Sequence, residues 1–167
     1  MTNRPRAVFD CNVLLQAAAR GNSVAAHCLR FAENDLIQLF VSRDVLAEIE
    51  NVLNRPEIRA HFPDLSDEIV GAFLRRLQQR AQLVRLVPKK FSYPRDADDE
   101  PYISLAVAAG ADFIVTRDRD LLDLMTGHTA ECKEFRQRFR PLRVVEPVEF
   151  LRAVEQASNE SGEERRV

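Results

Sequence analysis

The sequence has no tryptophan, few cysteines and no long apolar run. No stretch approaches the roughly 18 apolar residues that a membrane-spanning helix needs, and the first residues lack the apolar core of a secretory signal. The three cysteines, Cys11, Cys28 and Cys132, are odd in number and scattered. Their placement excludes a disulfide framework and a thiolate zinc cluster, and it predicts a protein of the reducing cytoplasm.

The sequence also lacks a strong excess of either charge. It has 24 Lys and Arg residues against 26 Asp and Glu, a net charge of −2. This balance excludes a broadly cationic nucleic-acid coat, so any contact with nucleic acid has to be local and assisted by a metal ion. A chain of 167 residues is long enough for one domain, predicted here over residues 1–156. The polar segment 157–167 is predicted to be a disordered tail.

Short β-like runs alternate with helical spacing along the chain. Strands are predicted over residues 6–10, 36–41, 83–87, 112–116 and 143–145. Helices are predicted over 13–31 (one helix or two), after the N-caps Ser42 and Ser66, and over 102–110, 118–125 and 149–156, whereas 126–139 has no clear assignment. This alternation predicts an α/β fold with three layers, α/β/α, around a central, mostly parallel sheet of four to five strands.

Four acids fall at four strand-to-helix junctions of this pattern. Asp10 closes the first strand, Glu48 lies in the second turn of the helix after the second strand, Asp99 precedes the helix after the third, and Asp118 follows the fourth. In an open parallel sheet these junctions lie at one edge, where ligands bind. The sequence therefore predicts four carboxylates in one place, although residues 10 and 118 are far apart along the chain.

Each of these acids has a structural explanation by itself, as a helix cap or a solvated helix residue. Four acids in one place need a further explanation, because two carboxylates about 4 Å apart repel each other by about 4 kcal/mol at an effective dielectric constant near 20. Oxygen ligands without Cys or His favour hard cations such as Mg²⁺ or Mn²⁺. Such ions activate water and stabilise the leaving oxygen in phosphodiester cleavage, so no histidine base is expected.

Three segments carry a resemblance to a known family: VFDCNVLL (residues 8–15), SRDVLAEIENVL (42–53) and DADDEPYISLAVAAGADFIVTRDRDLL (96–122). They resemble the PIN-domain family of metal-dependent ribonucleases, and most closely its bacterial VapC-like toxins of toxin–antitoxin systems. The resemblance covers residues 6–150 and implies a PIN-like (Rossmann-like) fold.

The resemblance also implies roles for individual residues. The four acids Asp10, Glu48, Asp99 and Asp118 match the family's metal-binding and catalytic acids. Supporting positions are matched by Asn12, Thr116 and Asp120, where Thr116 and Asp120 either orient the ligands or cap a helix. Arg117 either contacts a substrate phosphate or projects into solvent. Asp96 and Asp98 compete with Asp99 for the third acid, with Asp98 the nearer rival.

The leading hypothesis is therefore a Mg²⁺- or Mn²⁺-dependent endoribonuclease of the cytoplasm, acting as the toxin of a toxin–antitoxin system. The resemblance implies RNA as substrate, a cognate antitoxin as partner, and dimerisation. Two alternatives stay open: a PIN-like module that binds RNA or protein without turnover, and a phosphohydrolase with an aspartyl nucleophile at Asp10. The second alternative needs an acid two residues later, where the sequence has Asn12.

Overall fold

A computed structural model describes residues 3–166 of the chain. Its strands are β1 (Arg6–Phe9), β2 (Gln38–Val41), β3 (Gln82–Leu83), β4 (Phe113–Val115) and β5 (Arg143–Val145). They form one five-stranded sheet in the order β3-β2-β1-β4-β5, and every neighbouring pair is parallel. The predicted α/β fold with a parallel sheet is confirmed. The strand order reverses between β1 and β4, which is the usual ligand-binding position in such sheets.

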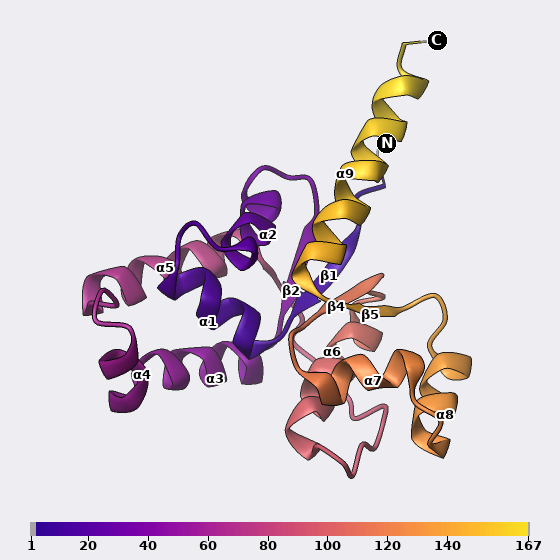
Figure 1. Ribbon diagram of the computed structural model, residues 1–167, viewed down its shortest axis with the longest axis horizontal. Coiled ribbons are helices and arrows are strands. Elements are labelled where there is room, and N and C mark those ends of the chain that lie inside the picture. Colours follow the sequence, from indigo (N-terminus) through magenta and orange to yellow (C-terminus); the bar gives the residue numbers. More distant parts are fainter. Residues whose placement is uncertain (1–2, 167) are drawn as a thin grey trace.

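Helices connect the strands and cover the sheet (Figure 1). Their bounds are α1 (Cys11–Ala19), α2 (Val24–Glu33), α3 (Arg43–Leu53), α4 (Pro56–His61), α5 (Asp67–Arg80), the 3-10 turn η1 (Ala97–Asp99), α6 (Glu100–Ala108), α7 (Arg119–Thr126), α8 (Ala130–Arg138) and α9 (Pro147–Glu164). None of the helices within residues 3–166 combines the length and apolar character that a membrane span requires.

Alternation along β1 shows which helix covers which face of the sheet. The Arg6 guanidinium donates to the Ala109 carbonyl at the end of α6, so Arg6 and Val8 face α6. Phe9, on the opposite face, packs edge-on against Phe150 of α9 at a centroid distance of 5.7 Å. The sheet is therefore covered on both faces, which is why β4 and, after Arg6, the rest of β1 consist of apolar residues.

Several helix ends follow from local sequence. Ser42 and Ser66 accept hydrogen bonds from the backbone N–H three residues later and so begin α3 and α5, as predicted. Gly110 follows the end of α6 with φ of 60°, a conformation that glycine adopts without strain. The stretch that had no clear assignment contains α8, which Thr129 begins by accepting from the Cys132 N–H.

The structure corrects two expectations and adds one helix. α3 ends at Leu53, and a short helix that was not predicted, α4, follows it with proline at its first position. The predicted strand 83–87 is only two residues long and begins at residue 82, because β3 pairs with just the last two residues of β2. The second correction concerns the C-terminus, predicted to be disordered from residue 157: α9 continues to Glu164.

The longer α9 has a physical reason. Adding residues to an existing helix is much easier than starting one, and residues 157–164 hold no proline to stop it. The side chains of residues 157–166 are exposed, in line with a segment that has little apolar surface to bury. Figure 1 shows this part of α9 extending away from the sheet beside the N-terminal residues. The expected domain boundary at residue 156 stays a prediction.

Candidate metal centre

The site lies at the carboxyl ends of β1 and β4. These strands are paired so that Phe9 is opposite Val115, and the Asp10 N–H donates to the Val115 carbonyl at 3.0 Å. Asp10 and Thr116 are therefore neighbours at the sheet edge. The Thr116 hydroxyl donates to Asp10 Oδ2 and accepts from the Asp118 N–H at 2.9 Å. One fully buried hydroxyl thus links two of the predicted acids.

Asp10 also begins α1. Its Oδ1 accepts a hydrogen bond of 3.0 Å from the Val13 N–H, and the side chain is only 4% exposed. Asp118 has the equivalent position at α7, where its Oδ1 accepts from the Asp120 N–H at 2.9 Å. Each carboxylate thus uses one oxygen as a helix cap, which fixes the direction in which its other oxygen points.

Asp99 is held differently. It begins α6 without any capping hydrogen bond from its side chain. The residue is 7% exposed, and its Oδ2 has no hydrogen-bond partner among the residues that the structure describes. A buried carboxylate oxygen without a donor destabilises the folded state, because it loses its hydrogen bonds to water and no protein hydrogen bond replaces them. This oxygen is therefore available to a ligand that supplies a hydrogen-bond donor or a positive charge.

Asp96 is brought beside Asp99 by the loop before η1. Phe91 and Tyr93 anchor that loop in the core, and the Tyr93 hydroxyl donates to the Asp120 carbonyl at 2.7 Å. The Arg95 guanidinium bridges Asp120 and Asp123, at 2.7 and 2.9 Å. These contacts attach the loop to α7, so the acids of the two segments face each other.

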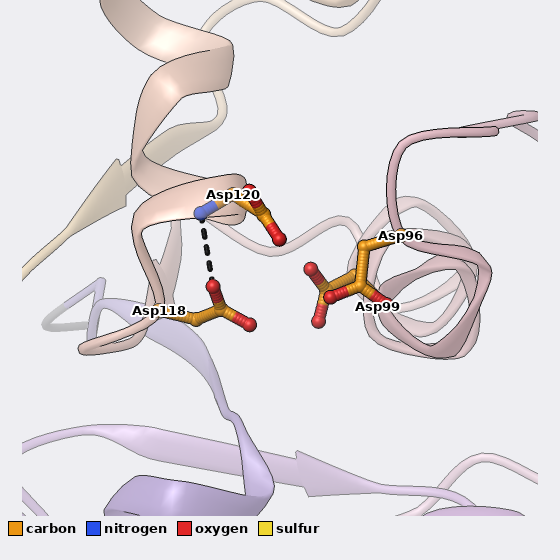
Figure 2. Close-up of side chains that lie close together, drawn as sticks. All are labelled: Asp96, Asp99, Asp118 and Asp120. Atoms are coloured by element: carbon orange, nitrogen blue, oxygen red, sulfur yellow. Dashed lines mark hydrogen bonds between the residues drawn. The ribbon is translucent and has the colours of Figure 1, made fainter.

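Figure 2 shows the outcome: Asp118 and Asp120 point from the start of α7 toward Asp96 and Asp99. One carboxylate oxygen of each of these four residues lies within 4.8 Å of the others. Four oxygens at that spacing surround a volume suited to a hard divalent cation.

Asp10 and Glu48 lie outside this tight group but line the same cavity, of about 350 Å³, as Asp99 and Asp118. Glu48 projects from α3, and its Oε2 accepts a hydrogen bond of 2.8 Å from the Tyr102 hydroxyl of α6. All four acids expected from the sequence therefore come together in one cavity. Whether each is a metal ligand stays a prediction.

Burial and mutual repulsion change the protonation of these acids. Burial raises the pKa of Asp99 to about 8, and the charges of Asp118 and Asp96 add to the effect. The pKa of Asp10 rises to about 6, mainly because of burial, although the hydrogen bonds from Thr116 and Val13 oppose the rise. A bound cation would reverse both shifts, because it favours the carboxylate form.

The other predicted positions are placed as follows. Asn12 is exposed and lines the cavity, and Asp98 does the same, whereas Asp99 is buried. Arg117 lines a neighbouring cavity instead and donates to Gln16 Oε1 at 3.3 Å. Its role as a phosphate contact stays a prediction. Asp120 is not the cap of α7, which is Asp118; it pairs with Arg95.

Sequence reasoning missed Tyr102 as a contributor to the site. A signal was available, because Tyr102 follows Asp99 by three residues at the start of α6 and so shares its helix face. Asp96 was considered only as a rival of Asp99. The structure places it beside Asp99 as a fourth member of the tight group.

Within residues 3–166, the lining of the cavity offers no activated nucleophile for covalent catalysis. Cys11 lines it, but burial raises the pKa of this thiol to about 12, so it stays protonated and poorly nucleophilic. None of the three histidines, all of which the structure describes, lines the cavity. The available chemistry is that of carboxylates and of a cation that they could hold.

Comparison with protein families agrees with this geometry. The sequence profile of the PIN domain matches residues 6–120, more than half of the chain. The chain belongs to the PIN-domain family. The matched region runs from β1 to Asp120 and so includes every acid of the site. A comparison with curated proteins finds no match.

Proposed function

We propose that this PIN domain is a Mg²⁺- or Mn²⁺-dependent endoribonuclease. The observation that carries the proposal is the buried, unpartnered Oδ2 of Asp99 within a group of four mutually close aspartates. Such a group is unfavourable without a counter-charge and favourable with a divalent cation. The oxygen-only donor set fits Mg²⁺ or Mn²⁺ better than zinc.

In this proposal Asp99 and Asp118 hold the ion directly, and Asp10 and Glu48 complete its surroundings on the cavity side. The bound ion would supply charge stabilisation at the phosphate and lower the pKa of water. A water molecule then adds to phosphorus, the bond to one ester oxygen breaks, and a phosphate monoester and a hydroxyl are formed. The carboxylates orient that water and accept its proton.

Two hydroxyl groups would keep the acids in position during this reaction. Thr116 is bonded to Asp10 and to the backbone of Asp118, and Tyr102 is bonded to Glu48. Hydrogen bonds to ligating carboxylates set their direction and usually change metal affinity by about 10- to 100-fold when they are lost. Thr116 thus orients the ligands in this proposal.

The test is cleavage of a labelled RNA by the purified chain with Mn²⁺ or Mg²⁺, and its loss in EDTA. The variants Asp99→Asn and Asp118→Asn should lose cleavage, and Asp64→Asn, at an exposed aspartate that does not line the cavity, serves as the matched control. Cleavage that survives both site substitutions would contradict the site assignment. RNA binding without turnover, unaffected by metal, would favour the alternative of a binding module.

We further infer that the chain is a VapC-like toxin, whose antitoxin would block the acidic cavity. Support comes from the three motif segments, which lie in the matched region or overlap its end. Expression of the wild-type chain should arrest growth, Asp118→Asn should relieve the arrest, and so should co-expression of a small neighbouring gene. Normal growth on expression of an active nuclease would contradict the toxin role alone.

A further inference from the structure

In the part of the chain that the structure describes, one cationic side chain lines the acidic cavity. Six carboxylates line it, and the one arginine beside them is Arg55. Arg55 lies between α3 and α4, and its side chain is exposed. Among the residues that the structure describes, its guanidinium has no hydrogen bond and no ion pair.

The backbone of Arg55 is nevertheless firmly placed. Its N–H donates to the Val52 carbonyl at 3.2 Å, and its own carbonyl accepts from Ile58 and Arg59. Pro56 follows directly, which restricts Arg55 to the extended conformation that it has, with φ of −67° and ψ of 134°. A fixed backbone thus carries a side chain that is free to meet a ligand.

The nearby Arg59 shows what a structural arginine looks like in the same segment. Its guanidinium donates to the carbonyls of Leu53 and Leu65, at 2.6 and 3.0 Å, and pairs with Asp67 at 3.0 Å. All of these contacts hold α4 to its neighbours. Arg55 has none of them, so stability of the fold does not account for its position.

Arg55 lines the cavity beyond the end of α3. Glu48 and Val52 are four residues apart on one face of α3, and both line the cavity. The helix continues to Leu53, about 8 Å along its axis from Glu48, and Arg55 follows in an extended conformation. The Arg55 guanidinium is therefore set apart from Glu48 in a cavity whose lining also includes the apolar side chains of Leu15, Val52 and Ile58.

We propose that Arg55 binds a backbone phosphate of the RNA strand, adjacent to the phosphate held at the aspartates. This inference rests on the proposed nuclease function. A planar guanidinium matches the oxygens of a phosphate with two parallel hydrogen bonds. Arg55 thereby positions the strand, while the chemistry stays at the acids.

The experiment measures binding and cleavage separately. Binding of a fluorescein-labelled single-stranded RNA is followed by anisotropy with Mg²⁺ across a salt series, in the Asp118→Asn background, which blocks turnover. Adding Arg55→Gln should weaken binding by about tenfold and reduce the slope of log K against log salt by about 0.7, as expected for one lost phosphate contact. Arg55→Lys should recover part of the affinity.

The matched control is Arg152→Gln on α9, an exposed arginine that does not line the cavity and should leave binding unchanged. In the otherwise wild-type chain, Arg55→Gln should raise KM and leave kcat within about twofold. The contact that it removes is made equally with the bound substrate and with the transition state. If Arg55→Gln matches Arg152→Gln in both assays while the wild-type chain cleaves RNA, this inference is wrong and the nuclease proposal stands. A wild-type chain that neither binds nor cleaves RNA overturns both.

Discussion

The Tyr102 hydroxyl donates a hydrogen bond of 2.8 Å to Glu48 Oε2 and so joins α6 to α3 across the cavity. We expect Tyr102→Phe to lower Mn²⁺ affinity by about tenfold, because Glu48 loses the donor that fixes its direction. Isothermal titration of the metal-free chain with Mn²⁺ measures the change. The ring keeps its volume, so the core should stay intact.

Ser66→Ala is the control for that substitution. It also removes a hydroxyl, which accepts a hydrogen bond of 3.2 Å from the Ile69 N–H at the start of α5 and does not line the cavity. Its loss should reduce stability by about 1 kcal/mol, as for an ordinary helix cap, with little effect on Mn²⁺ affinity. Equal losses of Mn²⁺ affinity in the two variants would contradict a specific role for Tyr102.

Removing the orphaned carboxylate should stabilise the metal-free chain. At pH 8 in EDTA, we expect Asp99→Asn to raise the free energy of unfolding by about 1–3 kcal/mol, since it replaces a buried group that resists ionisation with a neutral one. Urea unfolding measures this. Added Mn²⁺ should stabilise the wild-type chain and not the variant.

Asp98→Asn is the comparison variant for the Asp99→Asn experiment. Because Asp98 is exposed, this substitution should change the free energy of unfolding in EDTA by no more than about 0.5 kcal/mol. If Asp98→Asn rather than Asp99→Asn abolishes the stabilisation by Mn²⁺, then Asp98 is the third acid of the family pattern.

The metal-free chain should lose stability as the pH rises. An unfolded aspartate titrates near pH 3.9, whereas the folded chain raises the pKa of Asp10 to about 6 and of Asp99 to about 8 by burial. Between these values the folded state holds more protons than the unfolded state, so the free energy of unfolding falls from about pH 4 to pH 8. Urea midpoints in EDTA across this range test the sign, and a rise in stability would contradict it.

The protons on Asp10 and Asp99 compete with the cation, so Mn²⁺ affinity should increase as the pH rises from about 4 to about 8. Titrations of the wild-type chain with Mn²⁺ at pH 5.5 and pH 8 give the comparison. Asp99→Asn should show both a weaker affinity and a smaller dependence on pH. If the Mn²⁺ affinity of the wild-type chain does not depend on pH, then metal binding does not displace protons from Asp10 and Asp99.

Thr116 should be more important than its size suggests. We expect Thr116→Val to destabilise the chain by about 1–3 kcal/mol, because it leaves Asp10 Oδ2 and the Asp118 N–H without their partner. Thr116→Ser keeps the hydroxyl and should retain most Mn²⁺ binding. Thermal unfolding with and without Mn²⁺ separates loss of fold from loss of the site.

Much of the fold was predictable because its signals are local. The alternation of apolar strands with capped helices follows from residues such as Ser42, Ser66 and Gly110, which act within one turn of the chain. From this alternation, the rule that strand-to-helix junctions of a parallel sheet lie at one edge predicted that Asp10, Glu48, Asp99 and Asp118 come together there. Confirmation that they line a common cavity required the structure.

The rest depended on contacts that local patterns do not encode. Asp96 joins the site because Tyr93 and Arg95, in an irregular loop, are bound to α7. The short β3 reflects where β2 ends, and the extent of α9 reflects propagation from a helix already packed on the sheet. The position of Asp96 and the length of β3 are set by partners distant in sequence, and the extent of α9 by the propagation of a helix already formed; periodicity alone identifies neither.

The order of the acids along the chain has a consequence for a protein still being synthesised. Asp10 is synthesised early, but the Thr116 hydroxyl that binds it and the four clustered aspartates all lie within residues 96–120. A nascent chain that has not yet released α7 from the ribosome cannot close this group of oxygens around an ion. The four-aspartate group therefore forms only after the residues up to Asp120 have left the ribosome.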